Sequence, residues 1–416
     1  MNSETKDNKG KKYFIVFICM LIQAIPYCIA QNLQGQMQTP VSHSGFISEI
    51  AFTMLYFSGT LPVLLNPFFN KLYDKINIKY IYIIGLIIGG LGFASYGFAI
   101  NALTFNLSAA VTQIGTILFT GLSLPHMMAA WFPGEGRGTA LGIALAGGSI
   151  GNVFLQPIVV NLLTKYGWQR TYMILGAIIA IVGIPLVLLF IRFPRKGEVI
   201  KEKAVIKNDH HITYEGLSDK ENMKNKYYWL FNIGALLLCL SVVAISTQAI
   251  PILVSKGFES SKIAIAGSVF GISCLIGNVG GGKLFDKLGS FKPMMISFGG
   301  TILSLLIMAF MPKESIIGFL IPILSGLTIF TITSGPAFMP PDIFGHKDGM
   351  AKMAKTGMFY ALGSSVGAVG FTSISNMSSL RAASLTFLVI AIIGYTLNGF
   401  AIIKARQMFV AKEKEN

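Results

Sequence analysis

Residues 70–75 read Asn-Lys-Leu-Tyr-Asp-Lys, and residues 282–287 read Gly-Lys-Leu-Phe-Asp-Lys. The two copies lie 212 positions apart, about half of the 416-residue chain. Each copy stands at the end of a long apolar stretch, the second such stretch of its half. A repeat on this scale predicts a parallel duplication of a six-helix unit, which is a known transporter design and for which a receptor or membrane enzyme has no special need.

Apolar stretches long enough to cross a bilayer recur from one end of the chain to the other. Apolar residues make up 53% of the sequence and charged residues 12%, about half the charged share of a soluble domain. A spanning helix needs about 20 mostly apolar residues. The chain is therefore expected to be an all-α integral membrane protein of twelve transmembrane helices, at residues 13–34, 46–70, 79–100, 103–129, 138–164, 171–193, 227–255, 262–284, 293–311, 315–340, 353–377 and 381–404.

The longest polar stretch, residues 194–226, lies at the middle of the chain. We interpret it as a cytoplasmic linker between an N-terminal six-helix half, residues 1–193, and a C-terminal half, residues 227–416. Its adjacent histidines, His210 and His211, have no further ligands beside them and are interpreted as solvated. The four cysteines fall inside predicted spans without metal-like spacing, so neither a metal nor a cofactor is expected.

The basic residues are distributed unevenly along the chain. With the N-terminus placed in the cytoplasm, the external loops hold six of the 33 basic residues, namely Lys165, Arg170, Lys256, Lys262, Lys313 and Arg381. This asymmetry follows the positive-inside rule and predicts that both termini are cytoplasmic. The net charge of +15 then suits an anionic inner leaflet rather than nucleic acid. The first apolar run is interpreted as an uncleaved helix rather than a signal peptide, because many more spans follow it.

The repeat resembles the signature of the major facilitator superfamily, which is Gly-x-x-x-Asp-Arg/Lys-x-Gly followed by basic residues, between spans two and three. The second copy matches at Gly282, Asp286, Lys287, Gly289 and Lys292. The first keeps Asp74, Lys75 and Lys79 but has Asn70 and Asn77 where glycine is expected. The resemblance implies a gating loop that stabilises the outward-open state, its acidic residue facing the N-terminal end of a helix in the other half.

Three further stretches are similar to the monocarboxylate and oxalate–formate transporter branch of that superfamily. They are Trp131-Phe132-Pro133 with Gly136-Arg137-Gly138, Tyr166-Gly167-Trp168-Gln169-Arg170, and Asp342-Ile343-Phe344-Gly345 with Gly357. The second stretch lies between spans five and six, the others between four and five and between ten and eleven. Together with the repeat, they make Asp74, Lys75, Arg137, Asp286, Lys287 and Asp342 the candidate gating residues.

The branch often binds carboxylates through a basic residue in span eight and sometimes another in span eleven. Those positions fall here near Asn278 and Gly363, and neither is charged. No Lys or Arg is found deep inside any predicted span. The resemblance therefore favours an organic anion, whereas the uncharged positions favour a neutral or amphipathic solute.

Uncharged polar residues recur on the helices that line the central pathway of this fold, which are helices one, five, eight and eleven. Residues four apart share a helix face, and Pro26 is expected to break helix one locally and free backbone groups. The candidate substrate-binding residues are Gln23, Tyr27 and Gln31 on helix one, Asn152 and Gln156 on helix five, Asn278 on helix eight, and Tyr360 and Ser364 on helix eleven. The alternative is that these side chains hold helices together, at about 0.6 kcal/mol each.

Two titratable residues are candidates for proton coupling. His126 is expected about one turn inside the cytoplasmic end of span four, and Glu49 at the external start of span two. Histidine titrates near neutral pH. The alternatives are a structural hydrogen bond for His126 and a helix N-terminal charge for Glu49.

The sequence predicts a secondary active or facilitative transporter that moves a small solute by alternating access, with substrate bound near the midplane between the halves. The leading substrate class is a mono- or dicarboxylate, and the alternative is an uncharged or amphipathic solute. The expected surroundings are the lipid bilayer of a plasma membrane, typically a bacterial inner membrane. Nothing in the fold requires more than a monomer. An enzyme is not expected, because the spans hold no His/Asp/Glu cluster, and a sensor without flux would need an output domain that the linker and tails do not offer.

Overall fold

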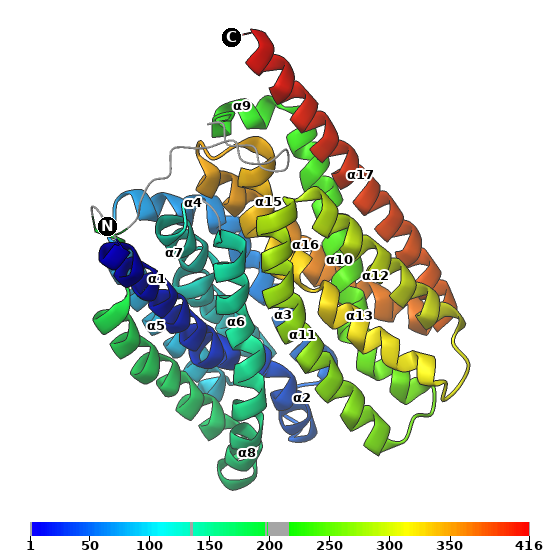
Figure 1. Cartoon of the computed structure of the whole chain (residues 1–416). Helices are drawn as coiled ribbons and strands as arrows, with labels where there is room; N and C mark the ends of the chain where they lie inside the picture. Colours follow the sequence, from blue (N-terminus) through cyan, green and yellow to red (C-terminus); the bar gives the residue numbers. More distant parts are fainter. Residues whose placement is uncertain (1, 134–135, 196–197, 199–215, 416) are drawn as a thin grey trace. The chain divides into compact units, whose positions relative to one another are not determined.

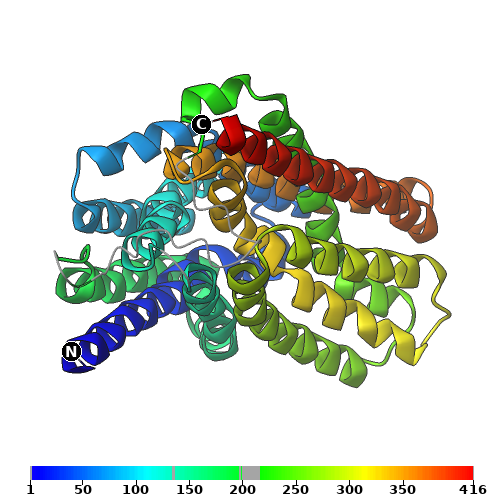
Figure 2. The same ribbon diagram turned by 45° about the horizontal axis from the view of Figure 1, so that its top comes forward.

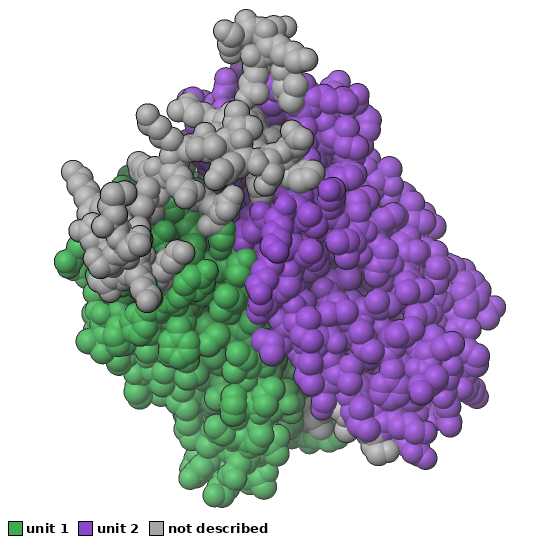
Figure 3. All heavy atoms as spheres, in the orientation of Figure 1, with its two compact units in different colours: residues 1–201 green, residues 202–416 purple. Residues whose placement is uncertain are grey.

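The computed structural model describes residues 2–133, 136–195, 198 and 216–415, with only the backbone for some of them. The chain forms two compact units, residues 1–201 and residues 202–416 (Figure 3), and each is described by itself. Every element of regular secondary structure in the described part of the chain is a helix, which confirms the all-α fold.

Unit 1 carries the first six predicted spans. Two of its elements, η1 and η5, are π-helices, and three, η2, η3 and η4, are 3₁₀-helices. Its elements in chain order are α1 (Asn2–Ile22), η1 (Gln23–Asn32), α2 (Gln34–His43), α3 (Glu49–Thr60), η2 (Leu61–Leu65), α4 (Asn66–Asn70), η3 (Lys71–Asp74), α5 (Ile78–Ser95), η4 (Tyr96–Phe98), α6 (Ala102–Thr116), η5 (Ile117–Gly121), α7 (Ser123–Trp131) and α8 (Arg137–Phe190).

Unit 2 carries the other six spans and one short helix, α9, that precedes them. Within it, α10 packs on α16 and α17, and α12 packs on α13 and α17 (Figures 1 and 2). Its elements are α9 (Asp219–Lys224), α10 (Lys226–Ser255), α11 (Ser260–Leu288), α12 (Phe291–Phe310), η6 (Ile316–Phe319), α13 (Leu320–Thr328), α14 (Phe330–Thr333), α15 (Gly335–Phe344), α16 (Gly349–Met377) and α17 (Leu380–Glu415).

Within the described ranges, ten helices are long and apolar enough to cross a membrane. One of them, α8, holds two predicted spans, because its backbone leaves helical angles at Gly167. The predicted second span is divided into α3, η2 and α4, with Pro62 and Pro67 at the starts of the later pieces, where proline fits a helix. The two parts of α8 and this divided span account for the twelve predicted helices.

The closest helix contact in unit 1 joins α1 and η1 to α8. A Cβ atom on Gly147 would lie 2.1 Å from the carbonyl oxygen of Met20, and one on Gly151 would lie 2.0 Å from that of Ala24. Such distances leave no room for any side chain. Small residues at membrane-helix interfaces allow backbones to approach in this way, so these two glycines hold the first and fifth spans together.

Candidate functional site

The polar face of helix one lies on the π-helix η1, which contains Pro26. The predicted local break is therefore present as a stretch of wider helix. Gln23 is buried and its side-chain amide donates to the hydroxyl of Thr120. The amide of Gln31 donates to Gln113 Oε1 at 2.8 Å. Both glutamines thus contact the fourth span, which is the geometry that the helix-packing alternative requires.

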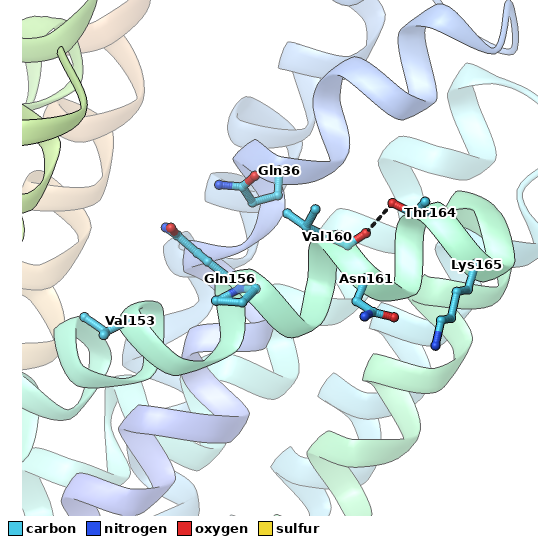
Figure 4. A pocket seen from close by; sticks show the side chains of 8 residues that line it. Gln36, Val153, Gln156, Val160, Asn161, Thr164 and Lys165 are labelled. Atoms are coloured by element: carbon cyan, nitrogen blue, oxygen red, sulfur yellow. Dashed lines mark hydrogen bonds between the residues drawn. The ribbon is translucent and has the colours of Figure 1, made fainter. Parts of the chain in front are cut away.

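The other polar residues of unit 1 lie on the facing surface of α8. The ring of Tyr27 lies beside Gly148, 3.7 Å from the position of a Cβ there. The thiol of Cys28 donates to Asn152 Oδ1 at 3.2 Å. Gln156 is exposed and lines a pocket of about 660 Å³ on unit 1 (Figure 4). The structure therefore brings Tyr27 and Asn152 to one side of the η1–α8 contact, with Gln156 one turn further along α8.

Of the candidates of unit 2, Asn278 and Tyr360 are buried and Ser364 is half-buried, and each has a nearby partner. Thr333 donates its hydroxyl hydrogen to Asn278 Oδ1 at 2.6 Å. The hydroxyl of Tyr360 points at the sulfur of Met339, 3.9 Å away. Ser364 donates to the carbonyl oxygen of Tyr360 at 2.9 Å. Asn278 thus faces α14 and Tyr360 faces α15, and no described hydrogen bond joins the two.

The first copy of the repeat places its aromatic residue on the predicted coupling histidine. Tyr73 and His126 stack with ring centroids 4.0 Å apart and an interplanar angle of 15°. His126 Nδ1 lies 2.7 Å from the carbonyl oxygen of Leu122, so Nδ1 carries the proton in that bond. The Tyr73 hydroxyl is 2.7 Å from Ser123 Oγ. The structural hydrogen bond that was the alternative for His126 is therefore present.

Two charged candidates, Asp74 and Arg137, interact electrostatically with this stack. Asp74 and Lys75 are exposed at the end of η3, and Arg137 is the first residue of α8. The charges of Arg137 and Asp74 both act on the His126 imidazole. The helix α3 begins at Glu49, but the side chain of Glu49 lies outside the described part of the structure.

The second copy of the repeat lies in the last two turns of α11, and a short turn at Gly289 and Ser290 leads from it to α12. Asp342 is buried, and its Oδ2 accepts hydrogen bonds from the Ser290 backbone N–H at 2.9 Å and from the Ser290 hydroxyl at 2.5 Å. Asp286 is half-buried and Lys287 is exposed. Helix α15 continues to Phe344, and Asp342 lies on it, after the candidate span Ile316–Thr333 and before Gly349–Met377. Asp342 therefore lies between spans ten and eleven as expected, on a short helix rather than in a loop.

Sequence reasoning missed Lys352, whose side chain is fully buried in the first turn of α16. Its Nζ donates to the carbonyl oxygens of Phe344 at 2.9 Å and Gly345 at 2.8 Å. These are end carbonyls of α15, which have no partner within that helix. The signal in the sequence was a lysine a few residues after a helix-ending glycine, a position that suits C-terminal capping.

A bidentate ion pair lies just after the end of α8. Arg192 makes a bidentate contact with Glu198, at 2.7 and 2.8 Å, and the Arg195 backbone N–H adds a third hydrogen bond. These bonds lower the pKa of Glu198 to about 2. Arg192 also lies over the ring of Trp131 at 5.4 Å. The contact ties the end of the sixth span to that of the fourth.

The described residues offer few side chains that could bind a metal ion. They contain no group of three or more His, Cys, Asp or Glu side chains that could hold a metal ion. The four cysteines are free and buried. His210 and His211 lie outside the described residues.

The many long apolar helices of the described residues, with polar side chains between them, identify a multi-pass membrane protein. The chain belongs to the Major Facilitator Superfamily, whose family model matches residues 13–368. Members of this family are transporters, not enzymes.

The relatives that the chain resembles are transporters by name. It is 26% identical to the uncharacterized MFS-type transporter YcxA of Bacillus subtilis, over 60% of this chain and 57% of that protein. It is 28% identical to the probable galactarate/D-glucarate transporter GudP of Bacillus subtilis, over 46% and 44%. It is 24% identical to monocarboxylate transporter 12 of Mus musculus, over 49% and 46%. These alignments thus span about half of each curated relative.

The fold is also that of a solved transporter. The crystal structure of the Major Facilitator Superfamily transporter FucP in the outward conformation superposes with a TM-score of 0.64, covering 94% of this chain and 98% of that one. Their identity of 16% shows a shared fold and nothing finer.

Proposed function

We propose that this chain moves a small organic anion, a mono- or dicarboxylate, across a plasma membrane by alternating access. Two relatives carry carboxylate substrates in their names, the galactarate/D-glucarate transporter and monocarboxylate transporter 12. That agreement is the observation on which the substrate class rests. The candidate binding residues supply amide and hydroxyl groups, which can hold a carboxylate by hydrogen bonds. We propose a monomer with both termini in the cytoplasm.

The alternative substrate is an uncharged or amphipathic solute. It is favoured by the candidate binding residues themselves, since none of the eight carries a charge. The amides of Gln23 and Gln31 already have protein partners. An anion held by such residues alone would lack the stronger, charge-assisted hydrogen bonds that a basic side chain provides.

Thermal unfolding of the purified chain separates these substrates. A ligand that binds only the folded state raises the melting temperature. We expect D-glucarate or L-lactate to raise it, and we expect Tyr27→Phe or Asn278→Ala to weaken that shift. Tyr80→Phe, which removes a hydroxyl from an exposed ring, is the matched control. A response to L-fucose with none to either carboxylate would overturn the anion proposal in favour of the alternative.

Exchange or facilitated diffusion is the transport mode that we propose, with proton coupling through His126 as the alternative. The stack on Tyr73 and the bond to Leu122 O give His126 a structural reason to be present. An imposed pH gradient across proteoliposomes distinguishes the modes. We expect no gradient-driven accumulation. Accumulation that His126→Phe abolishes, while exchange persists, would instead establish the histidine as the coupling group.

A further inference from the structure

Unit 1 carries a groove between α2 and α8 that the candidate binding residues reach only at one end. Gln36 enters it from α2, and the other lining residues come from α8 (Figure 4). Its volume of about 660 Å³ is within the usual size of small-molecule sites. The lining residues are Gln36, Val153, Gln156, Pro157, Val160, Asn161, Thr164 and Lys165.

The polar groups of this groove follow the axis of α8. Gln156 lies one turn beyond Asn152 along α8. Asn161 and Lys165 lie one turn apart further along the helix, and their side chains point away from the direction taken by Gln156, so they border the other edge of the groove (Figure 4). At 1.5 Å per residue, the distance along the axis from Asn152 to Lys165 is about 20 Å. Polar side chains thus border both edges of the groove between the predicted binding residues and the end of the fifth span.

Lys165 is the one charged residue among the eight that line the groove. Its side chain is exposed, and the described residues provide it with no ion pair or hydrogen bond. Thr164 beside it uses its hydroxyl hydrogen on the carbonyl oxygen of Val160 at 2.9 Å. The ammonium group is therefore available to a ligand, and the carboxamide of Asn161, one helical turn away, can donate further hydrogen bonds.

We propose that this groove is an outer anion subsite, where a carboxylate pairs with Lys165 and the amide of Asn161 before moving along the groove past Gln156 and Gln36 toward Asn152. The inference rests on the proposed function and on the proposed orientation, which puts Lys165 outside. It supplies the basic group that the predicted binding residues lack. Because the lysine is exposed, its field acts mainly by raising the local concentration and arrival rate of the anion, and salt weakens it.

Arg170 provides a matched control within the same external turn. It lies five residues after Lys165, is equally exposed, and does not line the groove. A change at either residue alters the net charge of the surface by the same amount. An effect confined to Lys165 therefore reports the groove rather than the general surface charge.

The test is concentration-dependent uptake of radiolabelled D-glucarate and L-lactate by the full chain in proteoliposomes, at low and at high salt. We expect Lys165→Glu to raise the half-saturating concentration by about tenfold at low salt and by about twofold at high salt. Lys165→Arg should behave as the wild type. The maximal rate and the melting temperature should not change in any of these variants.

Three outcomes would contradict the subsite, and they can be told apart. Normal uptake by Lys165→Glu, with wild-type uptake of a carboxylate established, overturns the subsite and leaves the proposed function intact. Equal shifts in Lys165→Glu and Arg170→Glu would assign the effect to general surface charge. Failure of the wild type to transport either carboxylate would refute the proposed function and the subsite together.

Discussion

The two copies of the repeat build the same stack from different chemistry. In unit 1, Tyr73 lies on His126, and in unit 2, Phe285 lies on Phe338 with ring centroids 4.9 Å apart and an interplanar angle of 23°. Both residues of the second pair follow those of the first by 212 positions. A flat pair between the second and fourth spans thus recurs in both units, whereas the polar and titratable version occurs in the first copy alone.

The copies also differ in how the next helix begins. In unit 1, Asn77 caps α5 itself, its side chain accepting from the Lys79 backbone N–H at 3.0 Å. In unit 2, the equivalent residue is Gly289, with a φ of 65° that favours glycine. Glycine has no capping side chain, and Asp342 from α15 supplies the acceptor at Ser290 instead. At the start of α5, the side chain of Asn77 thus provides the acceptor from within the same turn. At the start of α12, the acceptor comes from Asp342 on another helix.

The largest difference between the copies should appear when the stack is removed. Phe285 is fully buried and also contacts Phe330 edge-on, so Phe285→Ala should destabilise the protein by about 3 to 5 kcal/mol. Tyr73 is half-buried, and Tyr73→Ala should cost less. A thiol-reactive dye can follow unfolding because the cysteines are buried. An equal loss of stability in Phe285→Ala and Tyr73→Ala would show that the two stacks contribute equally, against this prediction.

The tertiary cap of unit 2 should be the next most costly to remove. Asp342→Ala leaves the Ser290 N–H and hydroxyl without their acceptor, and bonds of this charged type contribute about 2 kcal/mol. Asp342→Asn keeps an acceptor oxygen and should lose less. Unchanged melting of Asp342→Ala would show that α12 begins without help from α15.

The local cap of unit 1 should contribute less than the tertiary one. Asn77→Ala removes a single capping acceptor, and such changes cost about 1 kcal/mol. The same dye assay measures it, with Asn77→Gly as the control because glycine is tolerated at this position of a helix. A loss larger than that of Asp342→Ala would reverse the proposed ranking of the two caps.

The smallest expected effect concerns the ion pairs next to the linker, Arg192–Glu198 in unit 1 and Lys355–Asp219 in unit 2. Because the pKa of Glu198 is lowered to about 2, its pair stabilises the fold above the ordinary glutamate pKa of about 4.3. That contribution is lost as pH falls from there through 2. Melting curves between these pH values should show a decline that is shallower in Arg192→Ala. Parallel curves would assign the acid sensitivity to other groups.

The sequence predicted the elements better than their contacts. Apolar runs located the spans, and Pro26 indicated a break in helix one, because both signals are local. Asp342 was placed correctly between spans ten and eleven, but the sequence held no signal for the helix α15 that carries it or for its bond to Ser290. The burial of Lys352 and the bond from Gln31 to Gln113 depend on residues that only the folded chain brings together. The equivalence of Phe338 and His126 could have been found from the offset of 212.

The contact between α1, η1 and α8 has a consequence for how this protein can evolve. An alanine at Gly147 or Gly151 would place a carbon about 2 Å from a backbone oxygen of the facing helix. No rotamer change relieves such an overlap, since both atoms belong to the backbone or are fixed by it. In a library of all single substitutions, these two positions should accept glycine alone, whichever solute is used for selection. Variation in substrate would have to arise from the polar residues around them.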